Sequence, residues 1–181
     1  MFQFTQSVQF TADPGEQEAL PIRVSNQKIA EVLFNIATLL DMQQANPYRI
    51  AAYRRAARGL LTLGEPASQI IARGEKLTFA GLGERLRRKI TEFITTGRMT
   101  FYDDLVESSL PEDVRDLMRV AYVGPRTALR LSGQFDIHTV AQLFDAATNH
   151  KLRDAYGFGP RSEARLAEGA HALLAGHPIA A

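Results

Sequence analysis

Three short tripeptides interrupt an otherwise helical chain and strongly limit how it can fold. They are Gly81-Leu82-Gly83, Tyr122-Val123-Gly124 and Gly157-Phe158-Gly159, spaced by 41 and then 35 residues. Each has an apolar residue directly before a glycine, and each is followed by a charged helix start. Glycine tolerates positive φ and lets the backbone approach a ligand closely, so each tripeptide predicts a tight turn between two helices.

Helical periodicity describes most of the remaining chain after residue 25. Ile29, Leu33, Ile36 and Leu40 step by four, three and four residues along one helical face. Asn46-Pro47 then supplies a helix-capping residue followed by proline at the first helical position. No convincing strand pattern follows residue 25, so we expect an all-α fold.

The first 24 residues differ, because apolar residues alternate with polar ones between Phe2 and Phe10. This alternation predicts a short β-strand or a loose arm. We expect three units along the chain: an arm over residues 1–24, a basic domain over 25–100, and a second domain with two turns over 101–181.

The net charge of +1 conceals a strongly basic block. Residues 46–100 hold eleven Lys or Arg against four Asp or Glu, a net charge of +7, whereas residues 1–45 and 101–181 each carry −3. A basic block of this kind attracts phosphate groups. The alternative is an Arg-rich helical surface that is simply solvated.

Cysteine is absent and only four histidines are present, none at ligand spacing, so we expect neither thiol chemistry nor a zinc site. No apolar run reaches membrane-spanning length, and no secretory signal is visible at the amino terminus. We therefore expect a cytoplasmic protein, associated with the nucleoid if the source is bacterial, with no membrane partner.

Two helices joined by such a glycine turn form the helix-hairpin-helix pattern. The second helix directs its N-terminal N–H groups and positive dipole end at a phosphate. This contact carries no base information, so the pattern predicts sequence-independent DNA binding. The residues assigned to it are Gly81, Leu82, Gly83, Val123, Gly124, Arg126, Gly157, Phe158, Gly159 and Arg161, with Arg54 and Arg88 from the basic block. The alternative is that these glycines are ordinary helix caps.

Residues 46–57, residues 79–83, Lys89-Ile90 and Thr96-Gly97 together resemble the amino-terminal, lyase-type domain of family X DNA polymerases. Residues 119–131 and 136–145 are similar to the next helix-hairpin-helix module of that family. The resemblance covers about residues 25–175 and implies DNA repair at nicks, gaps or 5′-phosphate ends. The family's nucleotidyl-transfer and phosphoesterase domains have no counterpart in these residues, so we expect no polymerase or nuclease activity.

The resemblance also implies a candidate catalytic residue. In the resembling domains, a lysine after the first hairpin forms a Schiff base with an abasic sugar, and by position this is Lys89. Tyr53 would flank the lysine, Arg49 and Arg85 would hold the 5′-phosphate, and Tyr48 would stack on a base. Independently, neighbouring arginines should lower the pKa of Lys89 and favour its reactive neutral form. The alternative is a solvated cation or a simple phosphate contact.

Some positions depart from the family pattern. Phe101 replaces a basic residue, Ala80 replaces a proline, and Tyr122 replaces the first glycine of the second hairpin. Because a bulky residue resists positive φ, we expect this second hairpin to bind a phosphate or a structural monovalent cation poorly. No other metal or cofactor is expected.

Three functions therefore remain open: a non-catalytic DNA-binding protein, a metal-independent 5′-deoxyribose-phosphate lyase, and a protein-interaction scaffold in which the hairpins only pack helices together. Salt dependence separates the first from the last, because only phosphate contacts weaken steeply as salt rises.

Overall fold

The computed structural model describes residues 24–176, and within that range the chain forms α-helices and no β-strand. The helices are α1 (Asn26–Met42), α2 (Pro47–Leu61), α3 (Ala67–Ala72), α4 (Glu84–Thr96), α5 (Thr100–Ser109), α6 (Glu112–Leu117), α7 (Pro125–Phe135), α8 (Val140–Thr148) and α9 (Pro160–Leu174). The all-α expectation is confirmed. The strand or arm expected over residues 1–24 lies, except for Val24, outside the described residues.

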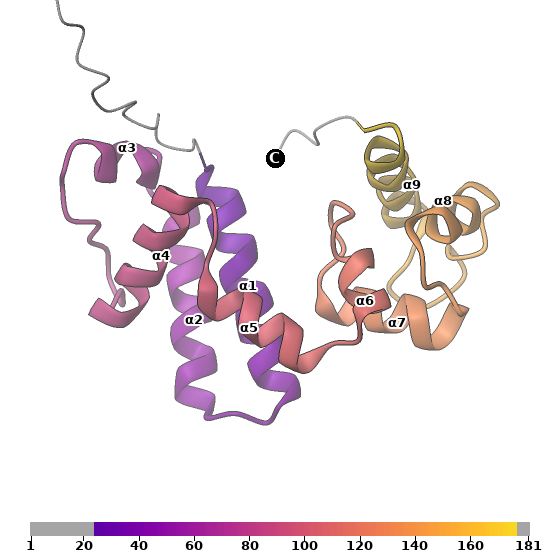
Figure 1. Ribbon diagram of the computed structural model, residues 1–181, viewed down its shortest axis with the longest axis horizontal. Coiled ribbons are helices and arrows are strands. Elements are labelled where there is room, and N and C mark those ends of the chain that lie inside the picture. Colours follow the sequence, from indigo (N-terminus) through magenta and orange to yellow (C-terminus); the bar gives the residue numbers. More distant parts are fainter. Residues whose placement is uncertain (1–23, 177–181) are drawn as a thin grey trace, which may run out of the picture.

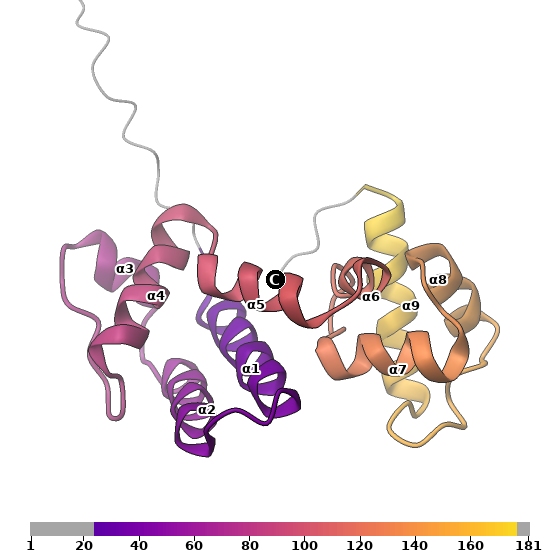
Figure 2. The same ribbon diagram turned by 60° about the horizontal axis from the view of Figure 1, so that its bottom comes forward.

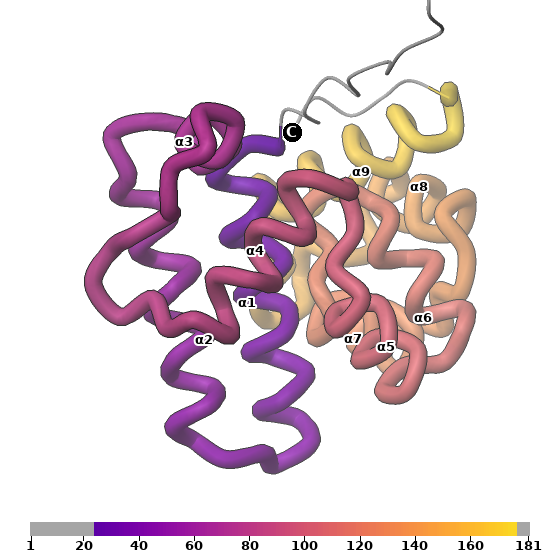
Figure 3. The backbone as a smooth tube through the Cα atoms, turned by 60° about the vertical axis from the view of Figure 1, so that its left-hand side comes forward, coloured from indigo at the N-terminus to yellow at the C-terminus, as the bar shows by residue number. Residues whose placement is uncertain are grey.

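Helices α1 and α2 form a long hairpin at the base of the amino-terminal half, which we define as residues 24–99 (Figure 3). The side chain of Ser25 caps α1 by accepting a hydrogen bond from the N–H of Lys28, and Asn46 caps α2 in the same way. The apolar face of α1 is fully buried, and Ala56 and Ala57 of α2 are buried with it. Small residues at this contact let the two helices approach closely.

The carboxy-terminal half, residues 112–176, contains α6 to α9, and α5 connects it to the amino-terminal half (Figures 1 and 2). Helix α5 packs against α1, and α8 packs against α9. The side chain of Thr139 and that of Gln142 form a reciprocal capping box at the start of α8. No helix in residues 24–176 is long and apolar enough to span a membrane.

The two halves touch where α7 meets α1. Asp41 at the end of α1 forms ion pairs with Arg54 of α2 at 3.4 Å and with Arg126 of α7 at 2.5 Å. The second contact joins residues that are 85 positions apart in the chain. The fold therefore places the turn before α7 beside the first helix.

Candidate nucleic-acid interface

The three tripeptides lie in turns with the same backbone structure. We call residues 79–83 hairpin 1, residues 120–124 hairpin 2 and residues 155–159 hairpin 3. The middle residue of each tripeptide donates its N–H to the carbonyl three residues earlier: Leu82 to Phe79 at 3.1 Å, Val123 to Val120 at 3.1 Å, and Phe158 to Ala155 at 3.0 Å. These three donor residues are all buried and anchor the turns in the core.

The first residue of each tripeptide has positive φ: +84° at Gly81, +68° at Tyr122 and +84° at Gly157. A positive φ at this position of the turn is typical of type II turns. Tyr122 adopts this conformation although a bulky residue resists it, and the weaker binding of a phosphate or cation expected at hairpin 2 stays a prediction. Because Val123 is buried and donates the same hydrogen bond as its counterparts, the surrounding packing holds hairpin 2 in the shape that glycine adopts elsewhere.

Each hairpin ends at the start of a helix, with glycine as the capping residue. Gly83 precedes α4, Gly124 precedes α7 and Gly159 precedes α9, and no side chain caps any of these helices within residues 24–176. The first N–H groups of a helix have no partner inside it. The three helix starts therefore offer N–H donors and a positive dipole end to an anion.

The hairpins differ in how open they are. Gly83 and Gly159 are exposed, and a Cβ at either position would meet no atom within 4 Å. At Gly124 a Cβ would lie 3.0 Å from the Oδ1 atom of Asn35 on α1. The backbone of hairpins 1 and 3 is thus open at the glycine before the helix, whereas the corresponding glycine of hairpin 2 lies close to α1.

Arginines that the sequence analysis did not assign lie over two of the hairpins. A Cβ at Gly81 would meet the Cδ atom of Arg55 at 2.4 Å, so the Arg55 side chain from α2 crosses hairpin 1. Arg130 from α7 donates to the carbonyl of Tyr156 at 2.6 Å and lies 4.5 Å from the ring centroid of Phe158 in hairpin 3. Arg55 falls within the family-like residues 46–57, which is the one signal that could have pointed to it.

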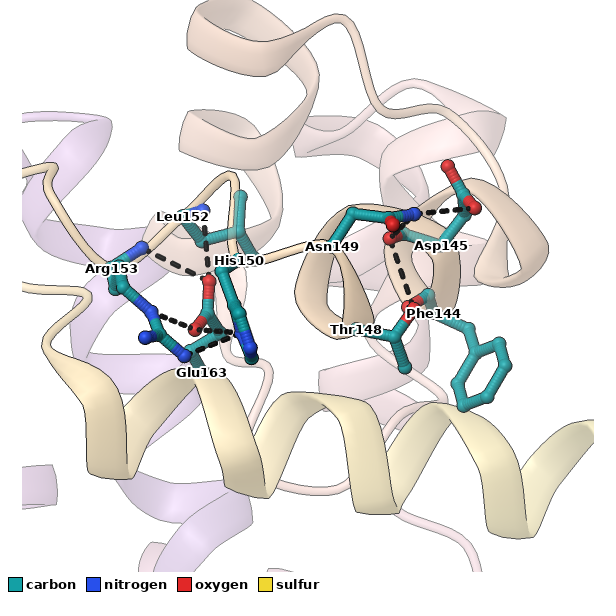
Figure 4. A network of polar contacts seen from close by, with 8 residues as sticks. All are labelled: Phe144, Asp145, Thr148, Asn149, His150, Leu152, Arg153 and Glu163. Carbon is teal, nitrogen blue, oxygen red and sulfur yellow. Dashed lines mark hydrogen bonds and ion pairs between the residues drawn. The ribbon is translucent and has the colours of Figure 1, made fainter.

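A buried carboxylate holds the segment before hairpin 3 in place (Figure 4). Glu163 of α9 accepts hydrogen bonds from the backbone N–H groups of Leu152 at 3.0 Å and Arg153 at 3.1 Å, and from the Arg153 side chain at 2.8 Å. The Nδ1 atom of His150 lies 3.2 Å away. Burial alone would raise the pKa of Glu163, but these hydrogen bonds outweigh it and hold the pKa below its ordinary value.

Lys89 lies in an aromatic and basic cluster formed by three helices of the chain. Its Nζ atom from α4 lies 3.1 Å from the ring centroid of Phe101 on α5. The Phe101 ring stacks on Tyr53 of α2, with centroids 6.1 Å apart and planes at 10°, and Arg49 lies 5.0 Å from the same ring. The structure thus brings Lys89, Tyr53 and Arg49 together, with Phe101 between them.

The position of Lys89 in this cluster lowers its pKa. Burial and, to a lesser extent, the nearby Arg49 lower its pKa to about 8, against the opposing effect of Glu92 and Asp104. The contact with the Phe101 ring favours the ammonium form and also opposes the lowering. Burial raises the pKa of Tyr53, against an opposing effect of Arg49. A lysine with a pKa near 8 has a substantial neutral fraction at neutral pH.

The other assigned side chains fall into two groups. Four of them are exposed: Tyr48, Arg85, Arg88 and Arg161. None of these three arginines has an ion-pair partner among residues 24–176. Arg54 and Arg126 instead share Asp41, so part of their charge is already compensated. Within the described residues, no three His, Asp or Glu side chains are grouped as metal ligands.

Known protein families match both halves of the chain. Residues 24–99 match the family described as a helix-hairpin-helix domain, and residues 114–172 match the SAM-like helix-hairpin-helix tandem. This chain is built from helix-hairpin-helix domains. Hairpin 1 lies within the first match, and hairpins 2 and 3 lie within the second.

A curated relative of the helix-hairpin-helix chain is the DNA polymerase/3'-5' exonuclease PolX of Bacillus subtilis. It is 24% identical over 138 residues, which are 76% of this chain and 24% of the relative. The chain therefore spans about a quarter of that relative's length. The match confirms the resemblance to the amino-terminal region of family X DNA polymerases.

Proposed function

We propose that this protein binds DNA without regard to base sequence, at nicks, gaps or 5′-phosphate ends. The repeated turn carries the proposal. Three times, a hairpin of the same shape presents an uncapped helix start, and α4, α7 and α9 are all at least 11 residues long. N–H groups arranged in this way bind phosphate oxygens and carry no base information.

Uncompensated positive charge supports the same function. Six side chains of the basic block have no ion-pair partner in the part of the chain that the structure describes: Arg49, Arg55, Arg58, Arg85, Arg88 and Lys89. These cations can contact phosphates without first breaking an internal ion pair. The match to a relative named as a DNA polymerase supports a role in DNA repair.

We assign the two DNA-contacting units to residues 25–100 and 101–181. The first would supply hairpin 1 and most of the free cations, and the second would supply hairpins 2 and 3. This role places the protein where DNA is found, which in a bacterial cell is the nucleoid.

The test is a titration of a fluorescently labelled gapped duplex at several salt concentrations. Gly83→Asp and Gly159→Asp each introduce a good helix-capping residue at a position where a Cβ meets no atom within 4 Å, so the fold should be kept. The new carboxylate would repel a phosphate at the helix start. We expect each variant to lose roughly tenfold or more in affinity, with wild-type affinity falling steeply as salt rises.

Gly64→Asp is the matched control, because Gly64 also has open space around it and lies outside the hairpins. It makes the same change in net charge and should alter affinity only slightly. Equal losses in all three variants would mean that charge alone matters and would contradict the hairpin contacts. Wild-type binding no tighter than about millimolar at low salt would exclude the function altogether.

A second candidate function is favoured by the lowered pKa of Lys89 and its position against Phe101. In a metal-independent lyase, the neutral amine attacks C1′ of the open-chain abasic sugar, and water leaves as the imine forms. Loss of a proton from C2′ then breaks the C3′–O bond and releases the downstream strand with its 5′-phosphate. Hydrolysis of the imine regenerates Lys89.

Borohydride reduction tests this candidate, because it converts the imine into a stable covalent adduct with DNA. We expect an adduct on a gapped duplex carrying a 5′-deoxyribose phosphate, and none with Lys89→Ala. Arg88→Ala removes the adjacent exposed cation without removing the amine, so at a saturating protein concentration it should keep the adduct. An adduct of wild-type yield with Lys89→Ala would exclude Lys89 as the nucleophile. Binding without an adduct in the wild-type protein would leave a non-catalytic DNA-binding protein.

A further inference from the structure

Tyr122 occupies a position that the other two hairpins give to glycine. Its φ is +68°, a conformation that glycine adopts without strain and a tyrosine does not. Gly81 and Gly157 make the same turn with no side chain, so hairpin 2 does not need the ring for its shape. The ring is also not part of the core, because Tyr122 is 65% exposed. A strained and exposed aromatic residue at a ligand-facing turn suggests that the ring itself has a use.

Helix α9 supports the ring from one side. The guanidinium of Arg165 lies 5.5 Å from the centroid of the Tyr122 ring. The backbone of α9 is close by, because a Cβ at Gly169 would lie 3.1 Å from a methyl group of Val120. This cation–π contact restrains the ring and, given its exposure, leaves it surface for another planar group.

Tyr122 also borders two hollows. One is a cleft of about 560 Å³ between α1 and hairpin 2, which Lys28, Glu31 and Arg119 also line. Lys28 forms an ion pair with Glu31 at 3.2 Å, and Arg119 one with Asp116 at 4.0 Å. The other is a pocket of about 140 Å³ between hairpins 2 and 3, which Arg130 and Arg165 also line. The smaller hollow therefore places two arginines without an ion-pair partner among residues 24–176 next to the tyrosine ring, which is the combination that binds single-stranded nucleic acid.

We propose that Tyr122 stacks on an unpaired base of bound DNA, so that the carboxy-terminal half prefers DNA with a single-stranded gap to DNA with a nick alone. The proposal rests on the DNA-binding function above and adds a choice of DNA structure to it. The stacked base would extend the Arg165–Tyr122 contact, and the neighbouring basic residues would face its phosphates. Stacking of this kind tolerates any base, so the preference is for structure and not for sequence.

The experiment compares two labelled duplexes of equal length, one nicked and one with a gap of five unpaired nucleotides. Tyr122→Gly removes the ring and replaces it with the residue that hairpins 1 and 3 use, so the melting temperature should not fall. We expect this variant to lose roughly tenfold in affinity for the gapped duplex and less than about twofold for the nicked duplex. Tyr122→Phe keeps the ring and should restore the preference for the gap.

Tyr156→Gly provides a matched control, because Tyr156 is 96% exposed within hairpin 3, where its ring lines neither hollow. It should keep the preference for the gapped duplex. A 2-aminopurine base in the gap gives a direct signal, since its fluorescence should be quenched by the wild-type protein and not by Tyr122→Gly.

Four results would overturn the proposal. One is an unchanged preference for the gap in Tyr122→Gly. Another is an equal loss with Tyr156→Gly, which would assign the effect to exposed tyrosines in general. If the wild-type protein binds the nicked duplex but shows no preference for the gap, the stacking role fails while the DNA-binding function stands. If it binds neither duplex, both fail.

Discussion

The two halves of the molecule use their arginines differently. In the amino-terminal half, Arg55, Arg58 and Arg85 are exposed and have no ion-pair partner among the described residues. In the carboxy-terminal half, Arg153 is bound by the buried Glu163, and Arg130 holds hairpin 3. The first half is therefore suited to attracting DNA by charge, whereas two arginines of the second half fix hairpin 3 and the segment before it. Similar hairpins thus sit in different electrostatic surroundings.

The largest expected effect concerns the chemistry of the first half. With a pKa of about 8, the neutral fraction of Lys89 rises about fifty-fold between pH 6 and pH 8 and then levels off above pH 9. The initial rate of imine trapping, measured on DNA held at saturation, should follow this curve. If Lys89 had an ordinary pKa, the trapping rate would instead keep rising about tenfold per pH unit up to pH 10. That result would show that the amino-terminal half holds no lysine with a lowered pKa.

The next effect tests the electrostatic contrast itself. Replacing Arg55, Arg58 and Arg85 with glutamine should lower the slope of log affinity against log salt by about three, since each lost phosphate contact removes about one. The matched variant replaces Arg130, Arg161 and Arg165, and we expect it to lower the slope by only about one. Fluorescence anisotropy on a gapped duplex measures both slopes. Equal slopes would show that both halves contact phosphates to the same extent.

The free energy of unfolding should depend more on the arginines of the carboxy-terminal half than on those of the amino-terminal half. Arg130→Ala removes a charge-assisted hydrogen bond to Tyr156 and the contact with the Phe158 ring, so the free energy of unfolding should fall by about 1–2 kcal/mol. Arg85→Ala should change it by less than about 0.5 kcal/mol, because Arg85 is exposed and has no ion-pair partner in residues 24–176. Urea denaturation measures both values. A comparable loss in Arg85→Ala would mean that the first half also depends on its arginines for stability.

The smallest effect is expected at the contact between the halves. Asp41→Asn releases Arg54 and Arg126 from their shared carboxylate. These ion pairs are partly exposed, so the free energy of unfolding should fall by no more than about 1 kcal/mol. Affinity for DNA at low salt should rise about two- to threefold, because two cations become free to meet phosphates. A fall in affinity would show that the halves must be held together to bind.

Local signals in the sequence were sufficient to predict the helices and the turns between them. The Asn46 cap, the spacing of Ile29 and Leu33, and the three tripeptides predict features that the structure contains. The positive φ of Tyr122 runs against the intrinsic preference of a bulky residue, on which the prediction of weak binding at hairpin 2 was based. The packing of Val123 and the turn hydrogen bond outweigh that preference.

The sequence by itself determined the α-helical class, the positions of the three hairpins and the basic block. These properties depend on residue type and on neighbours within a few positions. Only the tertiary structure decided which cations are free, which arginine lies over which hairpin, and how far Lys89 is buried against Phe101. The physical reason is that ion pairs and burial depend on helices brought together from distant parts of the chain. Arg126 and Asp41, 85 residues apart, show this most directly.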